Sequence, residues 1–306
     1  MSQQPPLFVL IGPTAVGKTE LSLTLAERFD GEIISADSRL FYRGMDIGTA
    51  KPSAAEQRRI PHHMIDLCNP DETITLGHYQ DQVNAIIADC HQRNKLPMLV
   101  GGTGQYVKAI IEGWGIPRVG PHPALRQALE QLGLAEMVRW LTYLDPVAAE
   151  RIDLQNPRRI IRALEVILVA GRPISELQAK TPPPWNIFTL GLFREREALY
   201  QRIDQRVDLM MTQGLEQEVR ALLTSGYTWN LPAMSGLGYR QFEPYLNGEA
   251  TLDEVVERIK FETHRFVRHQ NNWFRLEDES IHWVDASADD LITTAGELVD
   301  GWKSRQ

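Results

Sequence analysis

The chain has 306 residues, of which 43% are hydrophobic and 24% charged, and its formal net charge is −8. These values are ordinary for a globular protein with one large domain or two small ones. The negative charge argues against indiscriminate coating of nucleic acid, which depends on neutralising many phosphates, but it permits a local basic surface. No apolar run approaches the roughly 18 residues of a membrane span, and the N-terminal residues have no leader pattern. We therefore expect a soluble cytoplasmic protein, and a monomer.

The first third of the chain predicts strands that alternate with helices. Apolar runs at 7–11, 32–35 and 96–100 have the length of strands. Apolar residues recur at helical spacing at 19–29 and again at 79–90. This alternation predicts an α/β fold with a parallel sheet, whose ligands gather at the carboxyl ends of the strands.

After about Gly115 the pattern changes to several helical segments with no convincing strand. Strand character returns at 186–193, long helices are predicted at 195–214 and 252–276, and a last short strand is predicted at 281–284 before a terminal helix.

The domain organisation follows from these patterns. We expect an α/β core formed by residues 1–116 and 186–306, in which helices flank a parallel sheet. Residues 117–185 are expected to form a helical insertion domain.

One phosphate-binding pattern, G-x-x-x-x-G-K-[ST], follows the first predicted strand. Its residues are Gly12, Pro13, Thr14, Ala15, Val16, Gly17, Lys18 and Thr19. In such a P-loop, backbone N–H groups and the helix N-terminus surround phosphate oxygens, the lysine adds a positive charge, and the Thr19 hydroxyl can hold Mg²⁺. Because a strand and a helix flank it, the loop predicts a phosphate site.

Carboxylates and hydroxyls near the other strand ends are candidates for the chemistry. Asp37 follows the strand at 32–35, where it is suited to bind Mg²⁺, to act as a general base, or merely to cap the next segment. The strand at 96–100 ends in Gly101 instead of an acid, which leaves Asp37 as the best-placed carboxylate. Thr103, in the following turn, is suited to donate a hydrogen bond to substrate, although the glycines around it are also typical of a tight turn.

Arginines form two further candidate groups. Arg202 and Arg206 are four residues apart on one predicted helix face, where they form either surface ion pairs or a clamp for pyrophosphate. Residues 263–275 mix basic, amide and aromatic side chains, as a surface for bases and phosphates does, but Phe266 and Trp273 are equally suited to the core.

Histidine and cysteine give little indication of a metal site. His62 and His63 are adjacent in an extended segment and therefore point to opposite faces. Cys68 and Cys90 are too few for a disulfide framework and are expected to be buried.

Six motifs in order make the chain resemble the tRNA dimethylallyltransferase (tRNA isopentenyltransferase) family of bacterial type. They are the P-loop, Asp37-Ser38-Arg39-Leu40-Phe41-Tyr42, Gly44-Met45-Asp46-Ile47-Gly48-Thr49-Ala50-Lys51-Pro52, Gly101-Gly102-Thr103-Gly104-Gln105-Tyr106, Gly238-Tyr239-Arg240-Gln241 and Arg268-His269-Gln270-Asn271-Asn272-Trp273-Phe274. The resemblance covers nearly the whole chain.

The resemblance implies transfer of a dimethylallyl group from dimethylallyl diphosphate to N6 of the adenosine 3′-adjacent to the anticodon, with release of diphosphate. It implies that the P-loop binds the diphosphate with Mg²⁺ and without ATP cleavage. The implied catalytic roles are Asp37 as general base, Thr103 as donor to the bridging oxygen, and Arg206 as a phosphate ligand.

The resemblance also implies contacts with the anticodon stem-loop of tRNA. The candidates are Asp37, Ser38, Arg39, Leu40, Arg158, Arg159, Gly238, Tyr239, Arg240, Arg268, Gln270 and Trp273. Leu40, Gln105, His269 and Asn272 depart from the commonest family pattern, which bears on the tRNA contacts but not on the catalytic candidates.

Three alternatives share some of these features. A P-loop small-molecule kinase also needs the loop, Mg²⁺ and an acid at the second strand. An adenylate isopentenyltransferase uses the same donor but a free nucleotide as acceptor, and it does not need the basic segment at 258–275. An RNA-binding module without catalysis predicts that Asp37 is dispensable.

Overall fold

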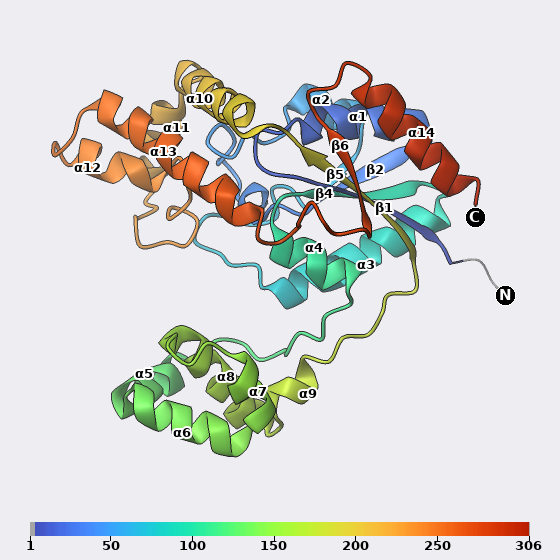
Figure 1. The fold of residues 1–306 in the computed structure, drawn as a ribbon. Coiled ribbons are helices and arrows are strands. Elements are labelled where there is room, and N and C mark those ends of the chain that lie inside the picture. Colours follow the sequence, from blue (N-terminus) through green and yellow to red (C-terminus); the bar gives the residue numbers. More distant parts are fainter. Residues whose placement is uncertain (1–3, 306) are drawn as a thin grey trace. The chain divides into compact units, whose positions relative to one another are not determined.

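The computed structural model describes residues 4–305, and its centre is a six-stranded parallel sheet with the strand order β3-β2-β4-β1-β5-β6. Figure 1 shows helices on both faces of this sheet. The strands are β1 (Pro6–Ile11), β2 (Gly31–Ser35), β3 (His62–His63), β4 (Leu96–Gly101), β5 (Asn186–Phe193) and β6 (Ile281–Asp285). The predicted α/β fold with a parallel sheet is confirmed.

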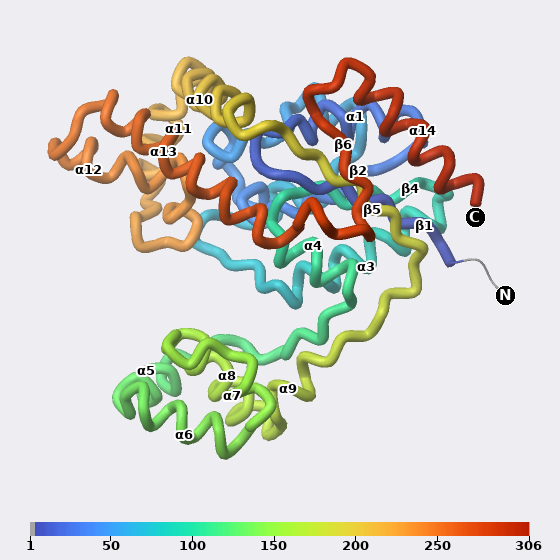
Figure 2. The backbone as a smooth tube through the Cα atoms, in the orientation of Figure 1, coloured from blue at the N-terminus to red at the C-terminus, as the bar shows by residue number. Residues whose placement is uncertain are grey.

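The chain divides into two compact units, residues 1–108 with 184–306 and residues 109–183. The chain leaves the sheet unit once and returns to it once (Figure 2). The helices associated with the sheet are α1 (Lys18–Phe29), α2 (Ala54–Arg59), α3 (Leu76–Gln92), α4 (Gly104–Ile111), α10 (Arg196–Thr212), α11 (Leu215–Thr224), α12 (Glu243–Leu246), α13 (Leu252–Gln270) and α14 (Leu291–Lys303), with short 3₁₀ turns η1 (Ser38–Phe41) and η2 (Arg240–Phe242).

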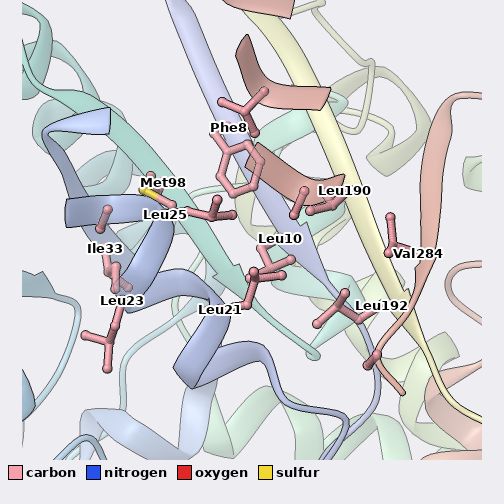
Figure 3. Close-up of a cluster of buried hydrophobic side chains, with 14 of the residues drawn as sticks. Phe8, Leu10, Leu21, Leu23, Leu25, Ile33, Met98, Leu190, Leu192 and Val284 are labelled. Atoms are coloured by element: carbon pink, nitrogen blue, oxygen red, sulfur yellow. The ribbon is translucent and has the colours of Figure 1, made fainter. Parts of the chain in front are cut away.

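The sheet is buried because helices cover both of its faces. Helices α1 and α14 lie on one face and α3 and α4 on the other (Figure 1). Phe8, Leu10, Leu21, Met98 and Leu190 are almost fully buried in the cluster on the α1 side, part of which Figure 3 shows. Strands covered on both faces read as continuous apolar runs, which explains why the apolar pattern of β1 does not alternate.

The second unit is helical and has a hydrophobic core of its own. It contains α5 (Pro123–Leu132), α6 (Leu134–Leu144), α7 (Pro146–Arg151), α8 (Pro157–Ala170) and α9 (Ile174–Leu177), whose buried residues include Met137, Leu141, Ile160 and Leu164. A buried carboxylate, Glu165, forms ion pairs with Arg126 and Arg162. Bonding to Arg126, opposed by burial, lowers the pKa of Glu165 to about 2.

The sequence predicts domain boundaries at 116/117 and 185/186, whereas the two compact units divide at 108/109 and 183/184. Backbone hydrogen bonds place residues 113–115 with the helical unit. The N–H of Thr181 donates to the carbonyl of Gly113 at 2.8 Å, and the N–H of Gly115 donates to that of Ala179 at 3.0 Å. Residues 113–115 therefore pair with the end of the helical unit.

Two further findings concern the helices. The helix predicted at 252–276 ends at Gln270, with Asn271 as its C-cap, so Trp273 lies beyond the helix and does not share a helical face with Phe266. Among residues 4–305, no helix is both long enough and apolar enough to span a membrane.

Candidate active site

Three loops meet at the carboxyl edge of the sheet. Strand β4 pairs with β1 on one side and with β2 on the other. The P-loop follows β1, Asp37 follows β2, and the turn containing Thr103 follows β4. The strand order thus brings three segments that are far apart in sequence to neighbouring positions.

A cavity of about 620 Å³ opens between these loops and α10. Its walls include three cationic side chains, Lys18, Arg202 and Arg206, and three acidic ones, Glu20, Asp37 and Glu56. The other wall residues are Thr14, Ala15, Gly17, Thr19, Ser22, Ile33, Ser35, Leu40, Thr49, Ala50, Pro52, His62, Ile65, Val100, Gly101, Gly102 and Leu209. The cavity is therefore suited to an anion with a small apolar group.

The structure brings most of the predicted donor-site residues to this cavity, but not all. Gly12, Pro13 and Val16 of the P-loop are buried behind the wall. Thr103 is also absent from the wall, although the preceding Gly102 is part of it. The backbone carbonyl of Thr103 accepts hydrogen bonds from Tyr106 and Val107 in the first turn of α4.

Lys18 is the cation at the bottom of the P-loop. Its ammonium group donates to the carbonyls of Gly12, at 2.9 Å, and Pro13, at 2.8 Å. Burial lowers the pKa of Lys18 to about 8, with Asp37 opposing this shift and Arg206 adding to it. A lysine in this state is only partly charged at slightly alkaline pH until an anion binds beside it.

Asp37 is the N-cap of η1, because its Oδ1 accepts from the backbone N–H of Arg39 at 3.0 Å. The capping role that the sequence left open is therefore present. Among residues 4–305, the other oxygen, Oδ2, accepts no hydrogen bond, and the side chain lines the cavity. Capping and a chemical role are compatible, since they use different oxygens.

The two arginines of α10 hold different parts of the site. The Nε–H of Arg202 donates to the carbonyl of Ala15 in the P-loop at 3.0 Å. Arg206 is directed to the carbonyl of Thr49, with Nη2 at 3.4 Å. Burial lowers the pKa of Arg206 from its usual value, and Asp37 opposes this shift. A guanidinium group stays charged under such a shift, so Arg206 places a desolvated cation in the cavity.

Glu218, on α11, anchors the loop that contains Thr49. Its Oε2 accepts from the backbone N–H groups of Asp46 and Ile47, both at 2.8 Å, and its Oε1 accepts from that of Gly48 at 3.1 Å. The hydroxyl of Tyr239 donates to the same Oε1 at 2.7 Å. One carboxylate therefore joins the cavity loop to the Gly238–Gln241 motif, a role that the sequence analysis missed because it depends on three distant segments.

Replacing Glu218 by alanine is expected to lower the free energy of unfolding by about 1 to 3 kcal/mol, because it leaves backbone donors and a buried hydroxyl without a partner. Thermal or urea unfolding measures the change. Exposed Glu249 is the matched control, and its alanine variant should unfold like the unaltered protein. Equal stability of the two variants would contradict the anchoring role.

The predicted tRNA contacts near the sheet occupy different environments. Tyr239 is 1% exposed, so its side chain is an internal anchor, and a tRNA contact at this position stays a prediction. Gly238 is also buried. Arg240 is exposed but paired with Glu262, and Arg39 donates to the carbonyl of Pro232.

The segment around the end of α13 is more open. Arg268 is exposed, and Phe266 and Trp273 are 43% and 39% exposed, so neither aromatic residue belongs to the core. Gln270 is half-buried. Arg158 and Arg159 are exposed in the first turn of α8, in the helical unit. Ser38 and Leu40 are half-buried in η1, and Leu40 lines the cavity.

The histidine pair diverges, as expected for adjacent residues of a strand. His62 bonds to the carbonyl of Ile60 at 2.7 Å, and His63 bonds to Glu32 at 2.7 Å. Glu32, His63 and Cys90 place potential ligand atoms within 4.8 Å of one another. However, the Arg93 guanidinium bonds to both oxygens of Glu32. Arg93 thus balances the buried charge of this cluster.

A family model described as "IPP transferase" matches residues 40–277. The chain belongs to the IPP transferase family. It is 52% identical to the tRNA dimethylallyltransferase of Roseiflexus sp. (strain RS-1), over 97% of this chain and 98% of that one, and 54% identical to that of Roseiflexus castenholzii, over 96% and 97%. The predicted resemblance is confirmed.

Solved structures of this family share the fold. The tRNA isopentenylpyrophosphate transferase of Bacillus halodurans is 37% identical with a TM-score of 0.74, covering 98% of this chain and 97% of that one. A eukaryotic dimethylallyltransferase, described as acting on tRNA, is 26% identical with a TM-score of 0.87, covering 99% of this chain and 80% of that one. Membership of the IPP transferase family therefore extends over nearly the whole chain.

Proposed function

We infer that this chain is a tRNA dimethylallyltransferase, which transfers a dimethylallyl group from dimethylallyl diphosphate to tRNA and releases diphosphate. The acceptor atom that we propose is N6 of the adenosine 3′-adjacent to the anticodon. One observation carries the assignment of the site. A single cavity combines the P-loop and its lysine, the half-buried Arg206, and the carboxylate Asp37.

The proposed reaction forms a C–N bond between N6 and the allylic carbon and breaks the bond between that carbon and the diphosphate oxygen. Negative charge grows on the leaving diphosphate, so positioned cations such as Lys18 and Arg206 stabilise the transition state more than the bound donor. Asp37 accepts the proton that N6 loses, through the oxygen that does not cap η1. The hydroxyl of Thr103 donates to the bridging oxygen.

Mg²⁺ is part of the proposal, and the donor groups around the P-loop fit it. The hydroxyl of Thr19 and the carboxylates of Glu20 and Asp37 line the same cavity, and Mg²⁺ prefers oxygen ligands together with substrate phosphates. Bound there, Mg²⁺ would supply further charge neutralisation for the diphosphate. We place it beside Thr19.

The acceptor has to leave its base stack before N6 can enter a cavity at the end of the sheet, so we propose that the adenosine flips out of the anticodon loop. Exposed Arg268, Trp273 and Phe266 offer positive charge and aromatic faces near the end of α13, which are the groups that bind unstacked bases and phosphates. Arg158 and Arg159 are proposed phosphate contacts on the helical unit.

The deciding experiment supplies both substrates together. Dimethylallyl diphosphate labelled in its allyl group, incubated with unmodified tRNA and Mg²⁺, should give label in tRNA at the adenosine beside the anticodon. In a parallel incubation with adenosine monophosphate in place of tRNA, label in the free nucleotide but none in tRNA would favour the adenylate isopentenyltransferase. ATP-dependent phosphorylation without allyl transfer would favour the kinase, and either result would overturn the proposal.

The lowered pKa of Lys18 predicts a pH dependence of donor binding. Below pH 8 the free protein carries the Lys18 charge that the diphosphate needs, whereas above pH 8 binding requires uptake of a proton. Affinity for dimethylallyl diphosphate should therefore fall above pH 8, by up to about tenfold per pH unit. Calorimetry at constant ionic strength measures it. Lys18→Arg should bind with a flat profile over this range, because arginine stays charged, and an equally steep fall in this variant would contradict the assignment to Lys18.

A further inference from the structure

The side-chain amide of Gln270 bonds at both of its ends within the candidate donor site. Gln270 is the last residue of α13. Its Oε1 accepts from the backbone N–H of Thr14, in the P-loop, at 2.9 Å. Its Nε2 donates to the carbonyl of Gly102, in the turn after β4, at 3.1 Å. The amide therefore bridges two of the three loops that form the cavity.

The amide of Gln270 packs closely against Gly102 in the turn after β4. A Cβ atom added to Gly102 would lie 2.6 Å from Nε2 of Gln270, so a residue with a side chain at this position would displace the amide. The next residues of the chain lie on the same turn. A Cβ added to Gly104 would lie 2.2 Å from Cγ of Trp273. The segment that follows α13 is thus packed on the turn that carries Thr103.

The two residues that precede Gln270 in the chain do not take part in this bridge. Arg268 and His269 are exposed, and within residues 4–305 neither side chain bonds to the P-loop or to the turn after β4. A bridge between an N–H and a carbonyl needs a side chain that accepts at one atom and donates at another. A glutamine amide has both an acceptor oxygen and a donor NH₂ group, whereas the side chain of lysine or arginine only donates.

We propose that Gln270 is a positioning residue of the donor site, which fixes the P-loop relative to the turn carrying Thr103, and not a residue that reads tRNA. By this bridge, α13 holds the diphosphate cradle in shape and connects it to the exposed surface around Arg268. The catalytic meaning of the bridge rests on the proposed function, but its effect on diphosphate binding does not.

The test measures binding of inorganic diphosphate with Mg²⁺, by calorimetry and without tRNA. Gln270→Met keeps the length of the side chain and removes both hydrogen bonds. We expect about tenfold weaker binding, because two modest hydrogen bonds that hold the loop are lost. Gln201→Met makes the same chemical change at an exposed position of α10 and should bind diphosphate like the unaltered protein.

Gln270→Glu provides a second test, the pH dependence of diphosphate affinity, which general damage to the fold would not change. Its carboxylate retains an acceptor for Thr14 but opposes the carbonyl of Gly102, whereas its protonated form regains a donor. The affinity deficit relative to the unaltered protein should therefore shrink as the pH falls from 7 towards 5, near the ordinary pKa of glutamate. Thermal melting of each variant checks that it is folded.

Normal diphosphate affinity in a folded Gln270→Met variant, with a raised KM for tRNA alone, would overturn the proposal and assign Gln270 to tRNA recognition. A pH-independent deficit in Gln270→Glu would also count against the bridge. If the unaltered protein binds diphosphate but transfers nothing to tRNA, the proposed function fails, while the bridge is still decided by the binding data.

Discussion

Asp37→Ala is expected to reduce the rate of dimethylallyl transfer to tRNA by about 10² to 10⁴, the range of general-base effects, while leaving diphosphate binding largely intact. The reason lies in the two oxygens of the carboxylate. Oδ1 accepts from Arg39 and caps η1, and Oδ2 remains available to the substrate amine. Single-turnover transfer with saturating donor measures the chemical step, and calorimetry measures diphosphate binding.

Asp37→Asn is the matched control for this prediction. Asparagine is a good N-cap and keeps the oxygen that accepts from Arg39, but it is not a base. We expect it to transfer as slowly as the alanine variant while melting at a higher temperature. A near-normal transfer rate in Asp37→Asn would show that the residue acts only as a cap.

Arg206→Gln is expected to lower kcat/KM for dimethylallyl diphosphate by about 10² to 10³, the magnitude of losing one preorganised donor to developing negative charge. The desolvated guanidinium lies in the same cavity as Lys18 and Asp37. Its charge acts on the leaving diphosphate with little screening by water. Steady-state kinetics with a fixed tRNA concentration measures the loss.

The matched control is Arg202, one turn earlier on α10. Its side chain is exposed at the surface and donates to the carbonyl of Ala15, so Arg202→Gln should reduce kcat/KM much less than Arg206→Gln. Arg206→Lys keeps the charge but loses the planar fork, and an intermediate rate is expected. Equal losses in Arg202→Gln and Arg206→Gln would contradict a special role for Arg206.

Much of the fold was predictable because its signals are local. The P-loop pattern, its flanking strand and helix, and the return of strand character at 186–193 lie in continuous stretches of sequence, and each corresponds to an element of the structure. The predicted helix at 252–276 was six residues too long, because side-chain periodicity continues past Gln270 while the backbone turns at Asn271. The two-residue strand β3 carries no pattern that distinguishes it from a loop.

The site was predictable in part. Lys18, Asp37 and Arg206 were named from sequence and share one cavity. The burial of Tyr239, by contrast, follows from its packing in the structure, and an aromatic residue beside an arginine is equally typical of a surface that binds RNA. The anchoring by Glu218 has no local signal, since its backbone partners lie 170 to 172 residues away.

Local sequence patterns predict alternating strands and helices and a phosphate loop after the first strand, and they include six family motifs in order. These properties depend on residues adjacent in the chain. The set of side chains that share the cavity depends on the tertiary structure, because the strand order places β4 between β1 and β2 and so brings distant loops together. The fold also brings Gln270 to Thr14 across 256 residues, a contact that no local pattern in the sequence predicts.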